Sequence, residues 1–191
     1  MIGDWGLSMQ FKTSQGRVKH EIAGPLSEAN LAGVDLGGVW LCEQDLRGAN
    51  FAEAIFTSVN FSDCDLGGAT FAGAVLEGAH FDSANLTDAK FTNADLYCAT
   101  FDQATLTRVD FEGASLRGID LAHADLSGVN LRNANLGIDN LGGATTLQGA
   151  DLRTADLRGT RLAGAEYNQH TRFPDSFDPT KAQMVLRSSK Q

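Results

Sequence analysis

With 191 residues and 42% hydrophobic side chains, the chain is long enough for one domain with a full core, and its composition is neither disordered nor membrane-like. The net charge of −9 disfavours nucleic acid and anionic lipid as partners, because both require clustered Lys and Arg. The first residues, MIGDWGLSMQ, lack a basic segment followed by an apolar stretch, and no run of about 18 apolar residues occurs. We therefore expect a cytoplasmic protein that does not bind membranes.

Two short runs near the start alternate apolar and polar residues. The first run contains Trp5, Leu7, Met9 and Phe11, and the second contains Val18, His20 and Ile22. Thr13 to Gly16 supply a turn between them, so residues 1–25 are predicted to form a β-hairpin that caps one end of the fold. Residues left over from an expression tag are the competing interpretation of the first few positions.

Large apolar residues, Leu or Phe, recur at every fifth position from Leu26 to Leu141. A small apolar residue, usually Ala, lies two positions before most of them, and Gln44 and Asp139 clearly break this pattern. A helix needs apolar spacings of three and four, and a flat strand needs uninterrupted alternation, so neither fits. A period of five predicts short extended pieces separated by turns, four of which close a square coil. Gly residues such as Gly48 often follow the large residue by two positions, where a corner can require positive φ.

Four pentapeptides make a coil of 20 residues, so residues 20 apart are expected to stack on one face. The phenylalanines then form two facing columns, which are Phe51, Phe71, Phe91 and Phe111 on one side and Phe61, Phe81 and Phe101 on the other. A further column, from Leu26 to Leu126, contains only Leu. Aromatic rings are thus expected to fill the middle coils, while the small residues keep the interior from being overfilled. A structural role is sufficient for these phenylalanines.

The tandem units closely resemble the pentapeptide-repeat family. Examples are Ala49-Asn50-Phe51, Ala94-Asp95-Leu96 and Ala124-Asp125-Leu126. The resemblance covers residues 26–167 and implies an all-β fold, the right-handed quadrilateral β-helix of that family. At ~4.8 Å per coil, about seven coils predict a rod of roughly 34 Å.

The five-residue register changes once, because the large residue after Leu141 is Leu147. One extra residue therefore lies within Gly142 to Thr146. A bulge at a corner is the expected explanation, since such an insertion can loop outward without emptying the core. A functional protrusion is the alternative.

The last segment, residues 168–191, is predicted to cap the other end. The sequence from Thr171 to Pro179 resembles the closing segment of family members from photosynthetic bacteria, and its aromatic residues can plug the last coil. Asp178 as N-cap and Pro179 at the first helical position predict a short helix through about Leu186, with Met184 available for packing.

Residues with catalytic or metal-binding spacing are not found. The four histidines lack HExxH-type spacing, the Gly-rich stretches follow the repeat and not a phosphate-binding motif, and no cofactor is implied. Cys42, Cys64 and Cys98 are odd in number and form no CxxC pair, so we expect free thiols and neither disulfides nor a zinc site. We therefore expect a protein that is not an enzyme.

One face is predicted to carry an acidic stripe, which consists of Glu43, Asp63, His80, Asp82 and Asp102. Stacking at ~4.8 Å places Glu43 beside Asp63 and Asp82 beside Asp102. Like charges at that distance repel, so such a pair either takes up a proton or attracts a cation. A solvated wall whose carboxylates splay apart is the expected arrangement, and a bound cation is the alternative.

Three functions are compatible with these features. A scaffold whose flat walls dock an unidentified protein follows from the fold and from the lack of catalytic residues. A DNA mimic that binds and protects DNA gyrase is the alternative, because some family members act in this way and residues 26–112 carry fourteen Asp or Glu against Arg47, Lys90 and Arg108. The carboxylates are spread over all four faces, which argues against mimicry. An enzyme is the least supported of the three, and the chain is compatible with a monomer or a dimer.

Overall fold

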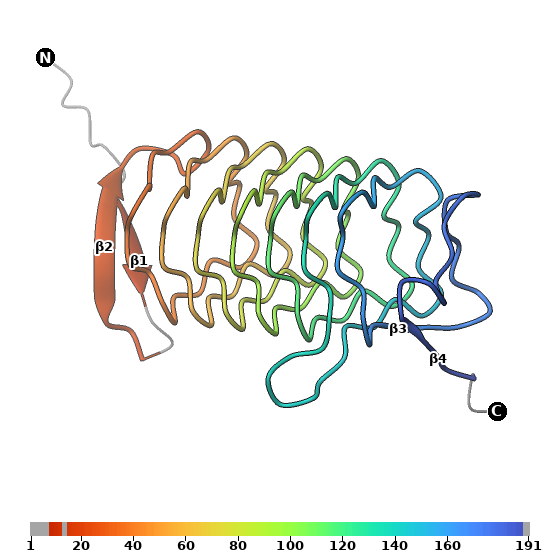
Figure 1. Ribbon diagram of the computed structural model, residues 1–191. Helices are drawn as coiled ribbons and strands as arrows, with labels where there is room; N and C mark the ends of the chain where they lie inside the picture. Colours follow the sequence, from red (N-terminus) through yellow and green to blue (C-terminus); the bar gives the residue numbers. More distant parts are fainter. Residues whose placement is uncertain (1–7, 13–14, 189–191) are drawn as a thin grey trace, which may run out of the picture.

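The computed structural model describes residues 8–12 and 15–188. The repeats form a rod of stacked coils, with β1 (Ser8–Lys12) and β2 (Val18–Ala23) at one end and β3 (Glu166–Tyr167) and β4 (Val185–Leu186) at the other (Figure 1). The described residues contain no α-helix, and hence none that could cross a bilayer.

The rod has four walls, along which most outward residues pair in parallel with the residue 20 positions later. Wall A is defined by Asn30, Asn50, Thr70, Lys90, Asp110, Asn130 and Asp156, and wall B by Asp35, Ile55, Val75, Asp95, Ser115, Asn135 and Arg161. Wall C is defined by Trp40, Asn60, His80, Thr100, Asp120, Thr146 and Glu166, and wall D by Asp45, Asp65, Asn85, Thr105, Asp125, Asp151 and Arg172.

Backbone hydrogen bonds join each coil to both of its neighbours. The N–H of Phe71 donates to the carbonyl of Lys90 at 2.7 Å, while the N–H of Asp95 donates to the carbonyl of Ala74 at 2.9 Å. Each corner is closed by a short bond, such as the one of 2.9 Å from the N–H of Ala74 to the carbonyl of Phe71. The backbone thus makes each wall a rigid platform. Some outward side chains add further links between coils, such as the bond of 3.0 Å from Asn50 Nδ2 to Asn30 Oδ1.

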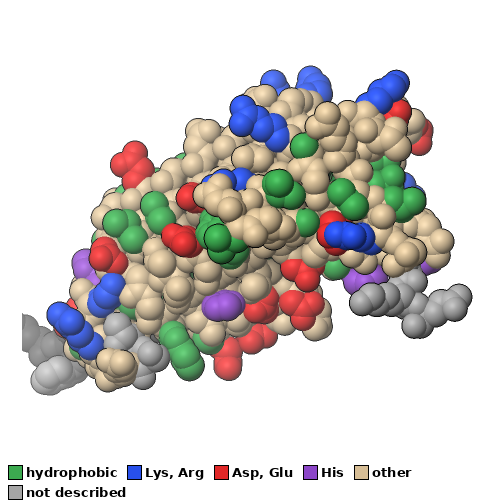
Figure 2. Space-filling view, turned by 60° about the horizontal axis from the view of Figure 1, so that its bottom comes forward, with side chains coloured by type: hydrophobic (Ala, Val, Ile, Leu, Met, Phe, Trp, Pro, Cys, Tyr) green, Lys and Arg blue, Asp and Glu red, His purple; other side chains and the backbone are tan. Residues whose placement is uncertain are grey.

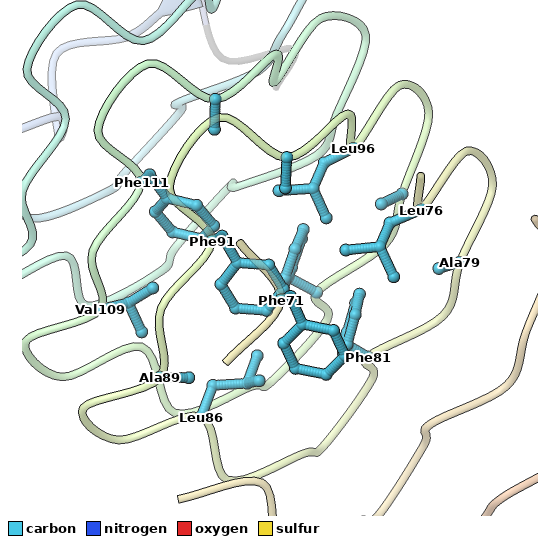
Figure 3. Close-up of a cluster of buried hydrophobic side chains, with 14 of the residues drawn as sticks. Phe71, Leu76, Ala79, Phe81, Leu86, Ala89, Phe91, Leu96, Val109 and Phe111 are labelled. Atoms are coloured by element: carbon cyan, nitrogen blue, oxygen red, sulfur yellow. The ribbon is translucent and has the colours of Figure 1, made fainter. Parts of the chain in front are cut away.

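The aromatic columns fill the middle of the rod. Phe71 stacks on Phe51 and Phe91 with ring centroids 5.0 and 4.7 Å apart. It also meets Phe61 and Phe81 of the facing column edge to face, at 5.6 and 5.8 Å. Figure 3 shows the two columns interleaved, with Leu and Ala side chains around them. The phenylalanines thus lie where the 20-residue spacing places them, and the edge-to-face contacts join the columns into one cluster.

The corner two positions after the large residue has positive φ even where it is not Gly. Glu43, Asp63 and Cys98 have φ of 61°, 60° and 55° in this position. The turn geometry therefore belongs to the coil and not to Gly alone, although Gly is the residue that adopts it without strain.

The hairpin of β1 and β2 covers the first coil. The strands are antiparallel, Phe11 is buried in the core, and Ile22 packs against it. The N–H of Trp40 donates to the carbonyl of Lys12, and Lys19 Nζ lies 3.0 Å from Asp35 Oδ1. The predicted contributions of Trp5 and Leu7, and the turn at Thr13 and Ser14, lie outside the described residues.

The C-terminal cap contains aromatic residues as expected but not the predicted helix. Phe173 packs against Tyr167 and Phe177, at 5.6 and 5.0 Å between ring centroids. Asp178 accepts hydrogen bonds from the next residues, but the turn ends after Gln183, whose φ is 58°. The chain then forms β4, which pairs in parallel with β3. The helix prediction was wrong because residues 185–186 form β4, which hydrogen-bonds to backbone groups that would otherwise be unpaired at the edge of the last coil.

The change of register is a protruding loop, and the prediction of a one-residue corner bulge was wrong. Asp120 pairs with Thr146, a spacing of 26 residues and not 20, and the other pairs that span the loop keep this spacing, whereas Thr146 and Glu166 are again 20 residues apart. Leu141 is 89% exposed, so it does not continue the interior column, and the next large inward residue after Leu136 is Leu147. Figure 1 shows the loop leaving the side of the rod and bending toward the N-terminal end. We call residues 137–145 the side loop.

Candidate functional site

The acidic stripe predicted from the sequence lies on wall C and at its corner. The N–H of Glu43 donates to the carbonyl of Ser62, and the N–H of Asp63 donates to the carbonyl of Asp82, so the members lie on successive coils. Asp82 and Asp102 are joined by a hydrogen bond of 2.9 Å from the N–H of Asp102 to Asp82 Oδ1. This bond attracts the Asp82 carboxylate to the backbone of its neighbour and so offsets part of the repulsion between the two side chains.

Thr100 connects His80 to Asp82, a link that the sequence reading missed. The Thr100 hydroxyl donates to Asp82 Oδ2 at 3.0 Å, and His80 Nδ1 lies 3.0 Å from the same hydroxyl oxygen. Because the single proton of the hydroxyl goes to the carboxylate, this geometry requires His80 Nδ1 to carry the proton that the oxygen accepts. The repeat spacing predicts that residue 100 lies over residue 80, so the link could have been found from the sequence.

This arrangement does not form a catalytic triad. The hydroxyl lies between the imidazole and the carboxylate, whereas a triad places the imidazole between the hydroxyl and the acid. The side chains of His80 and Asp82 are 48% and 36% exposed, on an open wall that does not exclude water. Within residues 8–12 and 15–188, no group of three or more His, Cys, Asp or Glu side chains could hold a metal ion. The stripe presents negative charge to solvent, and its geometry does not indicate a catalytic reaction.

The side loop is held in shape by Asp139. Asp139 Oδ1 accepts hydrogen bonds from the N–H groups of Leu141 and Gly143 at 2.8 and 2.6 Å, and the N–H of Asp139 donates to the carbonyl of Gly143 at 2.7 Å. The bond from Gly143 is the main reason that the pKa of Asp139 is lowered. Because one carboxylate satisfies the backbone on both sides of the tip, the loop presents Leu141 in a defined position.

Two side chains of the rod, Arg117 and Tyr97, hold the loop in place through hydrogen bonds. The Arg117 guanidinium donates to Asn140 Oδ1 at 3.0 Å and lies 5.7 Å from the centre of the Tyr97 ring. The Tyr97 hydroxyl donates to Asp139 Oδ2 at 3.4 Å. The loop thus leans over two coils that precede it, at the corner between walls B and C.

Thr145 returns the chain to the core. Its side chain is fully buried; the hydroxyl donates to the carbonyl of Leu116 at 2.8 Å and accepts from the N–H of Gly118 at 3.2 Å. Thr145 thereby occupies the position of the small residue two places before Leu147. Asp139, which broke that column in the sequence, is placed outside the core by the loop.

A groove of about 480 Å³ separates the loop from the rod. It is lined by Glu77, Asp95, Tyr97, Arg117, Asn140 and Leu141. Next to it on wall B, Val75 and Ile55 are 38% and 43% exposed. Figure 2 brings the loop side of the rod forward and shows exposed apolar side chains near its centre, with Asp and Glu side chains grouped beside a His below them. An apolar surface and an acidic surface therefore flank the loop.

The cysteines are free, and none lies in the groove lining. Cys64 is buried, its thiol donates to the carbonyl of Leu41 at 2.7 Å, and burial raises the pKa of this thiol to about 12. Cys42 is half-buried and Cys98 is exposed. A thiol with so high a pKa is not a nucleophile at neutral pH.

Family models match most of the repeat region. Residues 68–141 match a model described as a pentapeptide repeat region, and residues 26–63 and 143–166 match one described as pentapeptide repeats, with eight copies. The chain belongs to the pentapeptide repeat family. The matched segments leave two gaps, at residues 64–67 within the regular coils and at Gly142 within the side loop.

Solved pentapeptide repeat proteins are similar to this family member over most of its length. A trypsin-treated form of QnrB1, a plasmid-mediated fluoroquinolone resistance protein, is 18% identical, with 83% of this chain and 77% of that chain covered and a TM-score of 0.51. Alr5209, a pentapeptide repeat protein from Nostoc PCC 7120, is 36% identical, with 62% and 84% covered and a TM-score of 0.45. HetL, from Nostoc sp. strain PCC 7120 and involved in regulating heterocyst differentiation, is 26% identical, with 84% of both chains covered and a TM-score of 0.36. The QnrB1 likeness supports the fold and no more.

A comparison with curated protein sequences gave no significant match.

Proposed function

We propose that this pentapeptide repeat protein is a non-enzymatic scaffold that binds a segment of another protein between the side loop and wall B. Leu141 is the observation that carries the proposal. It is 89% exposed, yet it lies on a loop whose backbone is fixed by Asp139. A large apolar side chain that is ordered and solvent-exposed is suited to anchor a partner, because its burial contributes binding free energy without a large ordering cost.

The walls support this proposal. Hydrogen bonds between coils leave the outward side chains free to vary, and the backbone beneath them does not need to rearrange on binding. Val75 and Ile55 extend the apolar surface from the loop along wall B. Isolated exposed apolar residues are common on proteins, but here Leu141 lines the groove, and Val75 and Ile55 continue from it along wall B on successive coils.

The proposal predicts that partner capture depends on Leu141 and not on exposed apolar area in general. Tagged protein is used to capture partners from extracts of the source cells, and retained proteins are quantified by mass spectrometry. Leu141→Ser is expected to lower the retained partner about tenfold, the effect of losing roughly 1.4 kcal/mol of buried apolar contact.

Ile138→Ser is the matched control. Ile138 is 53% exposed on the same loop, but it lies against Gly164, away from the groove. The control should retain the partner at the wild-type level. Equal retention by both variants would place binding on another surface and remove the proposal.

Mimicry of DNA toward gyrase is the second candidate, and the acidic charge of residues 26–112 is the observation that favours it. Ion pairs interrupt that charge. Arg47 lies 2.7 Å from Asp45 and 3.6 Å from Asp65, and Arg108 lies 2.6 Å from Asp88. The Arg47 contact lowers the pKa of Asp45 to about 2. These pairs break the regular row of unpaired charges that a mimic of the phosphate backbone would present.

We expect no effect of this protein on gyrase. In a supercoiling assay with purified gyrase, a tenfold molar excess of the protein over enzyme should leave the rate of supercoiling unchanged. Inhibition by the wild type, relieved when acidic residues of walls C and D are neutralised, would instead establish the mimicry function.

A further inference from the structure

The groove beside the side loop carries uncompensated negative charge. Glu77 and Asp95 both line it, and neither forms an ion pair within the described residues. Asp95 Oδ1 accepts only the N–H of Tyr97, at 3.2 Å. A cation placed between these two carboxylates would find acceptor oxygens that the protein does not use.

The one cation of the groove is already engaged. Arg117 donates to Asn140 and to the Ser115 hydroxyl, and its guanidinium lies over the Tyr97 ring. These contacts hold the Arg117 guanidinium at the base of the loop. Arg117 therefore stabilises the position of Asn140 and is not available to bind an acidic ligand. With Asp139 also present at the loop, carboxylates outnumber cations around the groove.

Apolar surface lies on both sides of this charge. Leu141 borders the groove on the loop, while Val75 and Ile55 continue from Asp95 along wall B, each one coil from the next. Coils are ~4.8 Å apart, so the distance from Ile55 to the groove is about 10 Å, which an extended segment of three to five residues covers.

We propose that this groove selects a partner segment in which a Lys or Arg lies between bulky aliphatic residues, the cation binding Glu77 and Asp95 and the aliphatic side chains packing on Leu141 and Val75. This inference rests on the proposed scaffold function and specifies the chemistry of its partner. An acidic segment would bring its charge against two unpaired carboxylates, and a purely polar one would leave Leu141 exposed.

The test is an NMR titration of the full chain with blocked pentapeptides. The probe is Gly-Leu-Lys-Leu-Gly, and the controls are Gly-Leu-Glu-Leu-Gly and Gly-Ser-Lys-Ser-Gly. The probe should bind with a dissociation constant on the order of 1 mM and shift the methyl resonances of Leu141 and Val75. Each control should bind at least about fivefold more weakly. Equal binding of the Glu peptide or of the Ser peptide would overturn the proposal.

Charge variants locate the cation. Glu77→Gln combined with Asp95→Asn should weaken the probe about tenfold and reduce the salt dependence of its binding. Glu43→Gln combined with Asp63→Asn removes the same charge from the acidic stripe and should change nothing. If the Glu43→Gln and Asp63→Asn substitutions weaken binding instead, the peptide is bound by wall C and the proposal is wrong. Thermal melting shows whether each variant is folded.

A cross-linking experiment separates this inference from the scaffold function. A photoreactive amino acid replaces Val75, and the cross-linked segment is sequenced after irradiation in extracts of the source cells. A Lys or Arg between aliphatic residues in that segment supports the inference. A cross-linked segment that is acidic or lacks the cation overturns it, while the scaffold function stands. Failure of the Leu141→Ser capture experiment would remove both.

Discussion

Replacing Phe71 by Ala is expected to destabilise the protein by about 3–5 kcal/mol and to lower its Tm by roughly 10 °C. Phe71 is fully buried and contacts the rings of Phe51, Phe56, Phe61, Phe81 and Phe91. Truncation leaves a cavity at the point where both aromatic columns meet. The rigid coils cannot close around it, because their spacing is fixed by the backbone ladders.

Phe101→Ala is the comparison within the same interior. Among the described rings, Phe101 contacts only Phe81 and Phe111, so its truncation removes fewer aromatic contacts, each worth ~0.5–1.5 kcal/mol. Thermal and denaturant unfolding followed by circular dichroism should therefore rank the wild type above Phe101→Ala and Phe101→Ala above Phe71→Ala. If Phe71→Ala melts with or above Phe101→Ala, the joined columns are not what stabilises the middle of the rod.

The aromatic columns could be predicted because a solenoid converts sequence spacing into spatial contact. Residues 20 apart are neighbours in every complete coil, so Phe51, Phe71 and Phe91 are assigned to one column without knowledge of any distant contact. The same rule placed Asp82 beside Asp102. A globular fold offers no such rule, since its contacts join residues at many different separations.

The side loop was mispredicted because Leu141 obeys the five-residue period although its side chain is in solvent. The informative residue was Asp139. Continuing the column through it would have buried an unpaired carboxylate, which costs several kcal/mol, whereas a loop lets that carboxylate bind backbone N–H groups. Thr145 then supplies the inward small side chain. A carboxylate in the inner column was therefore a stronger signal than the continued period of large residues. The uncharged Gln44 breaks the same column without a loop, since its side-chain Nε2 donates to the carbonyl of Cys42 at 3.0 Å.

The C-terminal helix was mispredicted for a different reason. Asp178 and Pro179 are good helix-starting residues, and Asp178 does accept bonds from the following turn. The open edge of the last coil outweighs this local preference: the N–H of Val185 donates to the carbonyl of Ala165, and the N–H of Arg187 to that of Tyr167. The helix propensity of residues 178–186 cannot predict this pairing, because the unpaired backbone of the last coil exists only once the rod has folded.

The groove could not be predicted from the sequence, since its two sides come from separate parts of the chain. Glu77 and Asp95 are ordinary outward positions of the repeat, and Leu141 had been assigned to the core. Only the outward path of the side loop places Leu141 opposite them. The site therefore depends on the single feature that interrupts the repeat.

Removing the side loop is expected to leave the rod intact and to abolish partner binding. Deleting residues 138–143 and introducing Ala144→Gly leaves two Gly residues, Thr145, Thr146 and Leu147 after Leu136, which restores the five-residue register. Thr145 keeps its bonds to Leu116 and Gly118, since they lie within the rod. The free energy of unfolding should change by less than about 1 kcal/mol, because shortening a surface loop by a few residues alters its closure entropy only slightly.

Partner capture and the methyl shifts caused by the Gly-Leu-Lys-Leu-Gly probe should both be lost, a decrease of at least about tenfold. A variant in which residues 138–143 are replaced by six Gly and Ser residues keeps the loop length but lacks Leu141 and Asp139, and it should also fail to bind. If the deletion unfolds the protein, the six residues belong to the coil and not to a protrusion. If the deleted protein folds and still captures the partner, the rod binds it without the loop, because the deletion leaves only the rod side of the groove and wall B in place.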